Sequence, residues 1–99
     1  MKNNTYDNFF ANFANKTKFK IIMALQEKSL SVTEIIEATS EEQSKISHNL
    51  KKLAQSHVLE VKKQGKKHIY SLNKETVIPI LELVKTHVRK NCLLGKCCK

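Results

Sequence analysis

Apolar residues recur at helical spacing along the first part of the chain. Phe9, Phe10 and Phe13 predict a short helix within residues 3–15, and a second helical pattern follows over residues 16–28. The second pattern is apolar over much of its surface. We therefore expect that second helix to lie centrally in the core.

Two short helices with a tight connection are predicted next. Ser31 and Glu34 have the spacing of a capping box. In this motif the serine hydroxyl accepts a hydrogen bond from the backbone amide three residues later, and the side chain of the acid accepts one from the backbone amide of the serine. Ser40 and Gln43 repeat that spacing, which predicts a further helix over residues 40–56. Such a pair indicates a helix-turn-helix, although the turn contains no glycine.

The helix expected over residues 40–56 has two chemically different faces. Ile46, Leu50 and Leu53 fall on one face at about 100° per residue. A helix of this kind can rest on a core and enter the major groove of DNA, while an ordinary amphipathic helix with a solvated basic face is the alternative. The opposite face carries Ser44, His48 and Lys51, flanked by Ser47, Lys45 and Lys52.

Strand-forming residues dominate the stretch from 58 to 72. Apolar and polar positions roughly alternate there, and Gly65 lies mid-way, where it supplies the positive φ of a tight hairpin. Like charges at a hairpin tip repel, and a phosphate backbone would neutralise them. A hairpin that merely resists aggregation is the alternative. The crowded cations are Lys62, Lys63, Lys66 and Lys67.

A last helix is predicted over residues 76–91, because Pro79 is tolerated only within the first turn. Its apolar surface is wider than one small domain is expected to cover, which predicts a homodimer interface shared with the first helix. The seam consists of Val77, Leu81, Val84 and Val88.

Composition and charge narrow the function. The chain has 99 residues, about one domain, of which 40% are hydrophobic. Its net charge of +9 favours a polyanionic partner, with nucleic acid ahead of a membrane surface. No apolar run approaches the ~20 residues that span a bilayer, and residues 1–10 lack a signal-peptide pattern. We expect a cytoplasmic protein without a membrane partner.

Four segments, in order and at these intervals, resemble the ArsR/SmtB family of transcriptional repressors. They read NKTKFKIIMAL, LSVTEIIEAT, QSKISHNLKKL and VKKQGKKHIYSL, and the likeness runs from about Phe9 to Leu72. The resemblance implies a mainly α winged helix-turn-helix with a small β-hairpin, in the order α-α-α-α-β-β-α. It also implies a dimer formed through the first and last helices. Residues 1–91 would form this domain, and residues 92–99 a cysteine-containing tail.

The resemblance further implies that the helix over residues 40–56 enters the major groove of double-stranded DNA and that the hairpin reaches the adjacent minor groove. One segment of this chain departs from the family pattern: where Ser-Arg-His-Leu is common in the family, this chain has Ser47, His48, Asn49 and Leu50. Arginine reads guanine most strongly, so the base preference is expected to be softer or different. The predicted DNA-binding residues are Gln43, Ser44, Lys45, Ser47, His48, Lys51, Lys52, Lys66 and Lys67.

Metal-sensing sites of the family are only weakly represented. The region that carries a Cys-x-Cys motif in some members reads SVTEIIEATS here and has no cysteine. On the last helix, where others place Asp, His and Glu ligands, the chain offers Glu75, Glu82 and His87. The alternative is that these residues bind no metal and are ordinary surface positions.

All three cysteines lie within the last eight residues, where Cys92, Cys97 and Cys98, together with His87, could bind a thiophilic ion. Zn(II), Cd(II), Cu(I) and As(III) are the candidates, each as an effector and not as a required cofactor. Thiol oxidation and an inert tail are the alternatives.

The sequence thus predicts a DNA-binding transcriptional repressor that acts as a homodimer and is released from DNA by a thiophilic ion or by oxidation. A winged-helix module that docks an acidic protein, a regulator without metal sensing and a thiol-based metal carrier are the alternatives. We see no phosphate-binding glycine loop, paired carboxylates or nucleophile constellation, so we do not expect an enzyme.

Overall fold

Two helices open the chain, and a single asparagine separates them. In the computed structural model, which describes residues 3–91, α1 covers Asn3–Ala14 and α2 covers Lys16–Ala24. Asn15 starts the second helix, because its side-chain oxygen accepts a hydrogen bond from the backbone amide of Lys18, with 2.9 Å between the two atoms. Both predicted helices are confirmed, although α2 ends earlier than its sequence pattern predicts.

A short strand precedes the helix-turn-helix and adds to the predicted order. Strand β1 (Leu30–Ser31) pairs antiparallel with β3, so that Leu30 lies opposite Tyr70 and Ser31 lies opposite Ile69. The sheet has the strand order β1-β3-β2, and the elements follow one another as α-α-β-α-α-β-β-α. Two residues are too few to show an alternating pattern, so only the pairing identifies this strand.

The helix-turn-helix consists of α3 (Val32–Thr39) and α4 (Gln43–Gln55). The predicted capping box at the start of α3 is confirmed. The hydroxyl of Ser31 accepts from the backbone amide of Glu34 at 3.3 Å, and the Glu34 carboxylate accepts from the backbone amide of Ser31 at 2.9 Å.

The second predicted capping box, with Ser40 as N-cap of α4, is wrong. Ser40 instead ends α3: its φ of 57° and ψ of 32° are left-handed, and its backbone amide donates to the carbonyl of Ile36 at 2.8 Å. The N-cap of α4 is Glu42, whose side chain makes no capping hydrogen bond. Glu41 and Glu42 therefore precede α4 and do not occupy its first turn. Ser40 supplies the left-handed residue that a glycine usually provides in such a turn.

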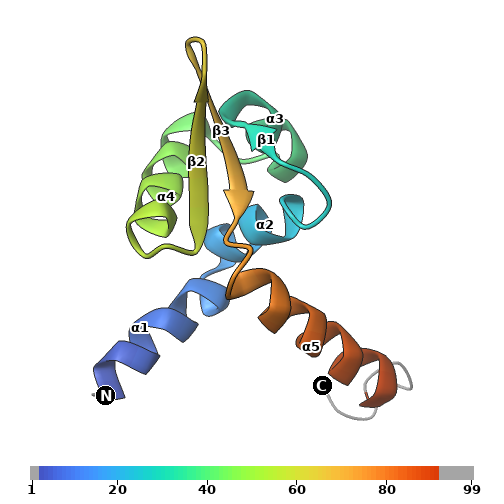
Figure 1. The fold of residues 1–99 in the computed structure, drawn as a ribbon. Coiled ribbons are helices and arrows are strands. Elements are labelled where there is room, and N and C mark those ends of the chain that lie inside the picture. Colours follow the sequence, from blue (N-terminus) through green and yellow to red (C-terminus); the bar gives the residue numbers. More distant parts are fainter. Residues whose placement is uncertain (1–2, 92–99) are drawn as a thin grey trace.

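The predicted hairpin is confirmed as β2 (Leu59–Gln64) and β3 (Lys67–Leu72), and it projects beyond the helices (Figure 1). Gln64 and Lys67 form its last cross-strand pair. Gly65 lies in the intervening turn with a φ of 61°, a conformation that glycine adopts without steric cost.

One hydrophobic core joins α2, the helix-turn-helix, the base of the hairpin and the start of α5 (Val77–Asn91). Pro79 lies in the first turn of α5, as predicted. All buried side-chain nitrogen and oxygen atoms of the described residues have hydrogen-bond partners. The core consists of Ile21, Ile22, Leu25, Leu30, Ile35, Ile46, Leu50, Leu53, Val58, Leu59, Leu72, Val77 and Leu81.

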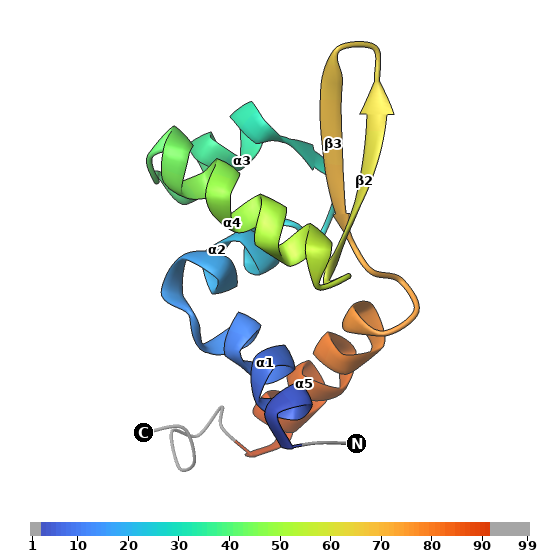
Figure 2. The same ribbon diagram turned by 90° about the vertical axis from the view of Figure 1, so that its left-hand side faces the viewer.

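Helices α1 and α5 extend away from this core at the end of the molecule opposite the hairpin (Figure 1 and Figure 2). Along α5, Val77 and Leu81 are buried, whereas Val84 and Leu83 are exposed, Leu83 by 72%. The predicted seam is therefore covered only over its first half within one chain. Among residues 3–91, no helix is both long enough and apolar enough to cross a membrane. This arrangement of helix-turn-helix, hairpin and flanking helices is a winged helix.

Candidate nucleic-acid interface

The buried stripe of α4 determines which of its side chains face outward. Ile46, Leu50 and Leu53 are at most 1% exposed and hold the helix on the core. Since these three positions lie on one side, the opposite side is left to solvent. Ser44, Lys45, Ser47, His48, Lys51 and Lys52 are exposed around this side, and Gln43 is exposed at the first position of the helix; the sequence predicts all seven as DNA-binding residues.

Asn49 does not belong to this exposed face. Its side chain is buried, and its amide nitrogen donates to the backbone carbonyl of Lys45 at 2.8 Å. Of the segment that departs from the family pattern, only Ser47 and His48 face solvent. A hydroxyl and an imidazole are therefore the groups that this part of the helix offers to a base edge or a phosphate.

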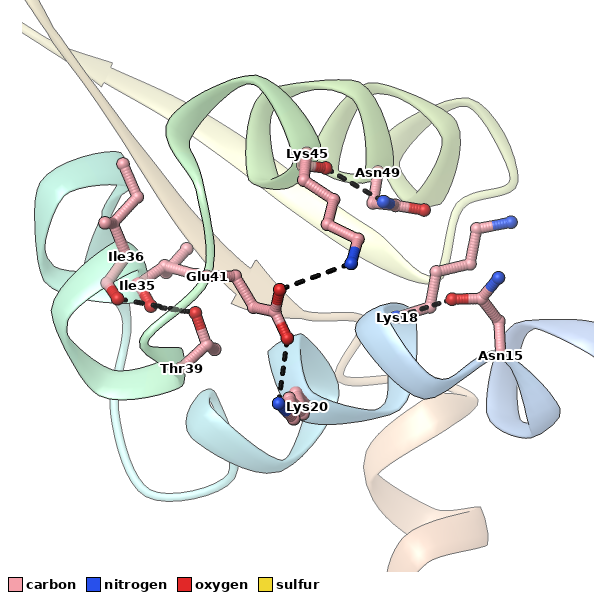
Figure 3. Close-up of polar contacts among 9 residues, drawn as sticks. All are labelled: Asn15, Lys18, Lys20, Ile35, Ile36, Thr39, Glu41, Lys45 and Asn49. Atoms are coloured by element: carbon pink, nitrogen blue, oxygen red, sulfur yellow. Dashed lines mark hydrogen bonds and ion pairs between the residues drawn. The ribbon is translucent and has the colours of Figure 1, made fainter.

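Lys45 is held by an ion pair that the sequence analysis missed. The Glu41 carboxylate lies 3.4 Å from the Lys45 ammonium and 2.8 Å from that of Lys20 on α2 (Figure 3). The hydrogen bond from Lys20, followed by the positive charges of both lysines, lowers the pKa of Glu41. The spacing of Glu41 and Lys45 was a usable signal, because residues four apart meet on a helix surface.

The hairpin presents cations on both of its faces. Lys63 lies opposite His68, and Lys67 lies opposite Gln64 in the next cross-strand pair, so the two lysines point to different sides of the sheet. All side chains from Val61 to His68 are exposed. Lys62, Lys63, Lys66 and Lys67, which the sequence analysis placed together at the tip, are therefore all exposed on the hairpin, although only Lys66 and Lys67 were predicted to contact DNA.

A groove of about 510 Å³ separates the hairpin tip from the first turn of α3, and Glu34, Lys67 and Ile69 are among its lining residues. Hydrogen bonds from the backbone amide and the hydroxyl of Ser31 lower the pKa of Glu34, and the charges of Lys28 and Lys67 lower it further. The groove therefore combines this carboxylate with the hairpin residues Lys66, Lys67 and His68, which also line it.

The predicted metal ligands lie almost entirely outside the described residues. Cys92, Cys97 and Cys98 belong to that part of the chain, and only His87 is described. The His87 ring is exposed, with its Nδ1 atom 3.3 Å from the side-chain nitrogen of Asn91. Within residues 3–91, no group of three or more His, Cys, Asp or Glu side chains is arranged to hold a metal ion. The thiol site stays a prediction.

Comparison with known proteins agrees with this geometry. Residues 15–60 match the family described as "Bacterial regulatory protein, arsR family". No curated protein matches the chain in sequence.

Solved structures share the fold over most of their length. HlyU from Vibrio cholerae superposes with a TM-score of 0.75 at 24% identity, covering 88% of this chain and 97% of that one. The homodimeric winged helix-turn-helix DNA-binding domain from Mycobacterium bovis has a TM-score of 0.78 at 22% identity, covering 88% and 81%. The transcriptional repressor BigR from Xylella fastidiosa has a TM-score of 0.73 at 20% identity, covering 85% and 86%. At these identities the likeness establishes the winged-helix fold.

Proposed function

Because this chain belongs to the arsR family of bacterial regulatory proteins, which its residues 15–60 match, we propose that it regulates transcription by binding duplex DNA as a homodimer. The observation that carries this proposal is the division of α4 into a fully buried apolar stripe and an exposed polar and cationic face. A helix seated in this way can place its outer side chains against base edges in the major groove.

The hairpin supports the same proposal through its charge. Lys62, Lys63, Lys66 and Lys67 gather at a tip that reaches beyond the helices, and the chain as a whole carries a net charge of +9. Phosphates would neutralise the repulsion among these lysines. We place the tip beside the groove next to the one that α4 enters.

A homodimer is supported by the apolar surface of the two outer helices. Phe10 on α1 and Leu83, Val84 and Val88 on α5 are exposed within one chain. Large apolar side chains exposed on two neighbouring elements of a soluble protein support an interface there. A two-fold pair would place two copies of α4 on successive major grooves, about one helical turn apart on the DNA. The relative from Mycobacterium bovis is described as homodimeric.

The test is fluorescence-anisotropy binding to the DNA upstream of the protein's own gene, measured across a salt series. Lys51→Ala should weaken binding and reduce the magnitude of the slope of log K against log[salt] by about 1, because one phosphate contact is lost. Lys74→Ala is the matched control, since Lys74 is an exposed lysine on the turn between β3 and α5. It should leave the slope unchanged.

Failure of the unmodified protein to bind duplex DNA at physiological salt would contradict this proposal. The basic face would then be assigned to an acidic protein partner. Equal losses for Lys51→Ala and Lys74→Ala would show that binding follows net charge alone and does not use α4 in particular.

We further propose that the protein is a repressor and that a signal at the C-terminal cysteines releases it from DNA. Three thiols within the last eight residues, Cys92, Cys97 and Cys98, support this proposal, because thiolates prefer Zn(II), Cd(II), Cu(I) and As(III) and also oxidise readily. Such a signal acts only through its different affinity for the DNA-binding and released states.

The same anisotropy assay, repeated with each ion in reductant and with an oxidant in its absence, tests the signal. Release by one ion that is abolished by Cys→Ser at all three positions would support a metal effector. Release by oxidant alone would assign the tail to redox sensing. Unchanged DNA affinity under every condition would overturn the effector proposal and leave the DNA-binding proposal intact.

A further inference from the structure

The turn of the helix-turn-helix contains a carboxylate that two lysines share. The Glu41 side chain is only 17% exposed, whereas those of Lys20 and Lys45 are 42% and 55% exposed. One carboxylate oxygen, Oε2, lies 2.8 Å from Lys20 Nζ, and the other, Oε1, lies 3.4 Å from Lys45 Nζ (Figure 3). The negative charge therefore lies between α2 and the first turn of the recognition helix α4.

The two lysines are not equivalent partners. Lys20 comes from α2, which packs in the core, and its short contact is also a hydrogen bond. Lys45 belongs to α4, is the more exposed of the two, and makes the longer contact. If Lys45 turns away, Glu41 still keeps one cation, so the partly buried carboxylate is not left without a partner.

We infer that Glu41 competes with DNA phosphate for Lys45, and that Lys20 retains the carboxylate when Lys45 transfers to the DNA. This inference rests on the proposed DNA-binding function and specifies how it is regulated by charge within the chain. Binding then exchanges one ion pair of Lys45 for another. Lys51, which makes no ion pair within the described residues, makes its phosphate contact without giving one up. Glu41 is thus a positioning residue that limits DNA affinity.

The central experiment is Glu41→Gln in the full chain, measured by anisotropy on the same DNA. We expect binding to tighten roughly two- to fivefold at low salt, which is the range that a surface ion pair supplies. The gain should shrink as salt rises, because the lost ion pair and the new phosphate contact are both screened. Thermal unfolding of each variant verifies that the fold is retained.

Glu42→Gln is the matched control, because Glu42 is the adjacent acid, is exposed, and makes no ion pair within residues 3–91. It removes the same charge near the DNA without freeing Lys45. Repeating both changes in a Lys45→Gln background separates the two effects. The gain from Glu41→Gln should disappear there, while any gain from Glu42→Gln should persist.

Lys20→Gln provides a second route that leaves Glu41 in place. With Lys20 gone, Lys45 is the remaining partner of the carboxylate, so DNA affinity should fall about twofold or more. This loss should vanish when Glu41→Gln is also present, because no carboxylate then holds Lys45. A loss that persists in the double variant would show that Lys20 acts on DNA directly.

Three results would overturn the inference. Glu41→Gln could lower DNA affinity in a folded protein, its gain could survive in the Lys45→Gln background, or the Glu41 carboxyl pKa, followed by NMR without DNA, could stay unchanged in both Lys20→Gln and Lys45→Gln. An unchanged Glu41 pKa in both variants would show that the two lysines do not share this carboxylate, and the measurement does not depend on DNA binding. Absence of DNA binding by the unmodified protein would instead contradict the proposed function, and this inference with it.

Discussion

The starts of α3 and α4 have the same local sequence pattern and different structures. Ser31 and Glu34 form a complete capping box, whereas Ser40 and Gln43, at the same spacing, do not. Ser31 is extended, with a φ of −79° and a ψ of 169°, which lets its hydroxyl reach the first turn of α3. Ser40 is left-handed, because it ends α3. One residue cannot end a helix in that conformation and also cap the next helix.

The difference leaves the two helices held by different forces. The start of α3 is held by two hydrogen bonds between a side chain and the backbone. The start of α4 has no side-chain cap, and the nearest support is the Glu41 carboxylate with its two lysines. Ion pairs between long exposed side chains are weak and screened by salt. The recognition helix is therefore the less firmly held of the two at its N-terminus.

Removing each serine hydroxyl in turn tests the difference between the two helix starts most directly. Ser31→Ala should lower the free energy of unfolding by about 1 kcal/mol, because an N-cap is lost. Ser40→Ala should change it by less than about 0.5 kcal/mol, because no cap depends on that hydroxyl. Urea denaturation followed by circular dichroism gives both values. Equal losses would mean that Ser40 caps α4 after all.

A second change addresses the backbone of Ser40. Ser40→Gly should raise the free energy of unfolding by roughly 0.5–1 kcal/mol, because glycine adopts a φ of 57° without the steric cost that a Cβ carries. Ser47→Gly, one turn into α4, should lower it by a similar amount, since glycine weakens a helix interior. Thermal unfolding of the two variants should therefore shift in opposite directions. A lower melting temperature for Ser40→Gly would contradict the left-handed assignment.

The smallest expected effect concerns pH and salt. Glu34 and Glu41 both have a pKa below the ordinary value of 4.5, so each contributes stability above that pH and loses it as the pH falls through its lowered pKa. Salt should raise the Glu41 pKa more than the Glu34 pKa, because lysine charges are screened whereas hydrogen bonds from Ser31 are local. Carboxyl-detected NMR titrations at low and high salt measure both. An identical salt dependence of the two pKa values would contradict the view that the two helix starts are held by different forces.

Local patterns with a direct physical cause were predictable from the sequence. Gly65 in the hairpin, Pro79 in the first turn of α5 and the Ser31 cap each depend on a few neighbouring residues. The buried position of Asn49 was also available, because it falls on the same helical face as Ile46 and Leu53. The sequence analysis considered only the apolar members of that face and made no prediction for the burial of Asn49.

Features that depend on distant partners were not predictable. Lys20 and Glu41 are 21 residues apart, and nothing in either segment indicates that they meet. Strand β1 depends on the backbone of β3, which lies about 40 residues further along the chain. The role of Ser40 followed from the need to end α3, which competes with the capping pattern that its neighbours display. In each case the tertiary structure, and not the local sequence, determines the outcome.

The pairing of β1 with β3 also has a mechanical consequence. Ser31 belongs to two structures, since its backbone pairs with the hairpin opposite Ile69 and its hydroxyl starts α3. We therefore expect a change in the tilt of the hairpin to shift the start of α3 with it, so that the spacing between the hairpin and the helix-turn-helix is limited. A duplex whose grooves are spaced differently has to deform to fit. Sequences that bend easily to that spacing would be preferred even at base pairs that no side chain touches.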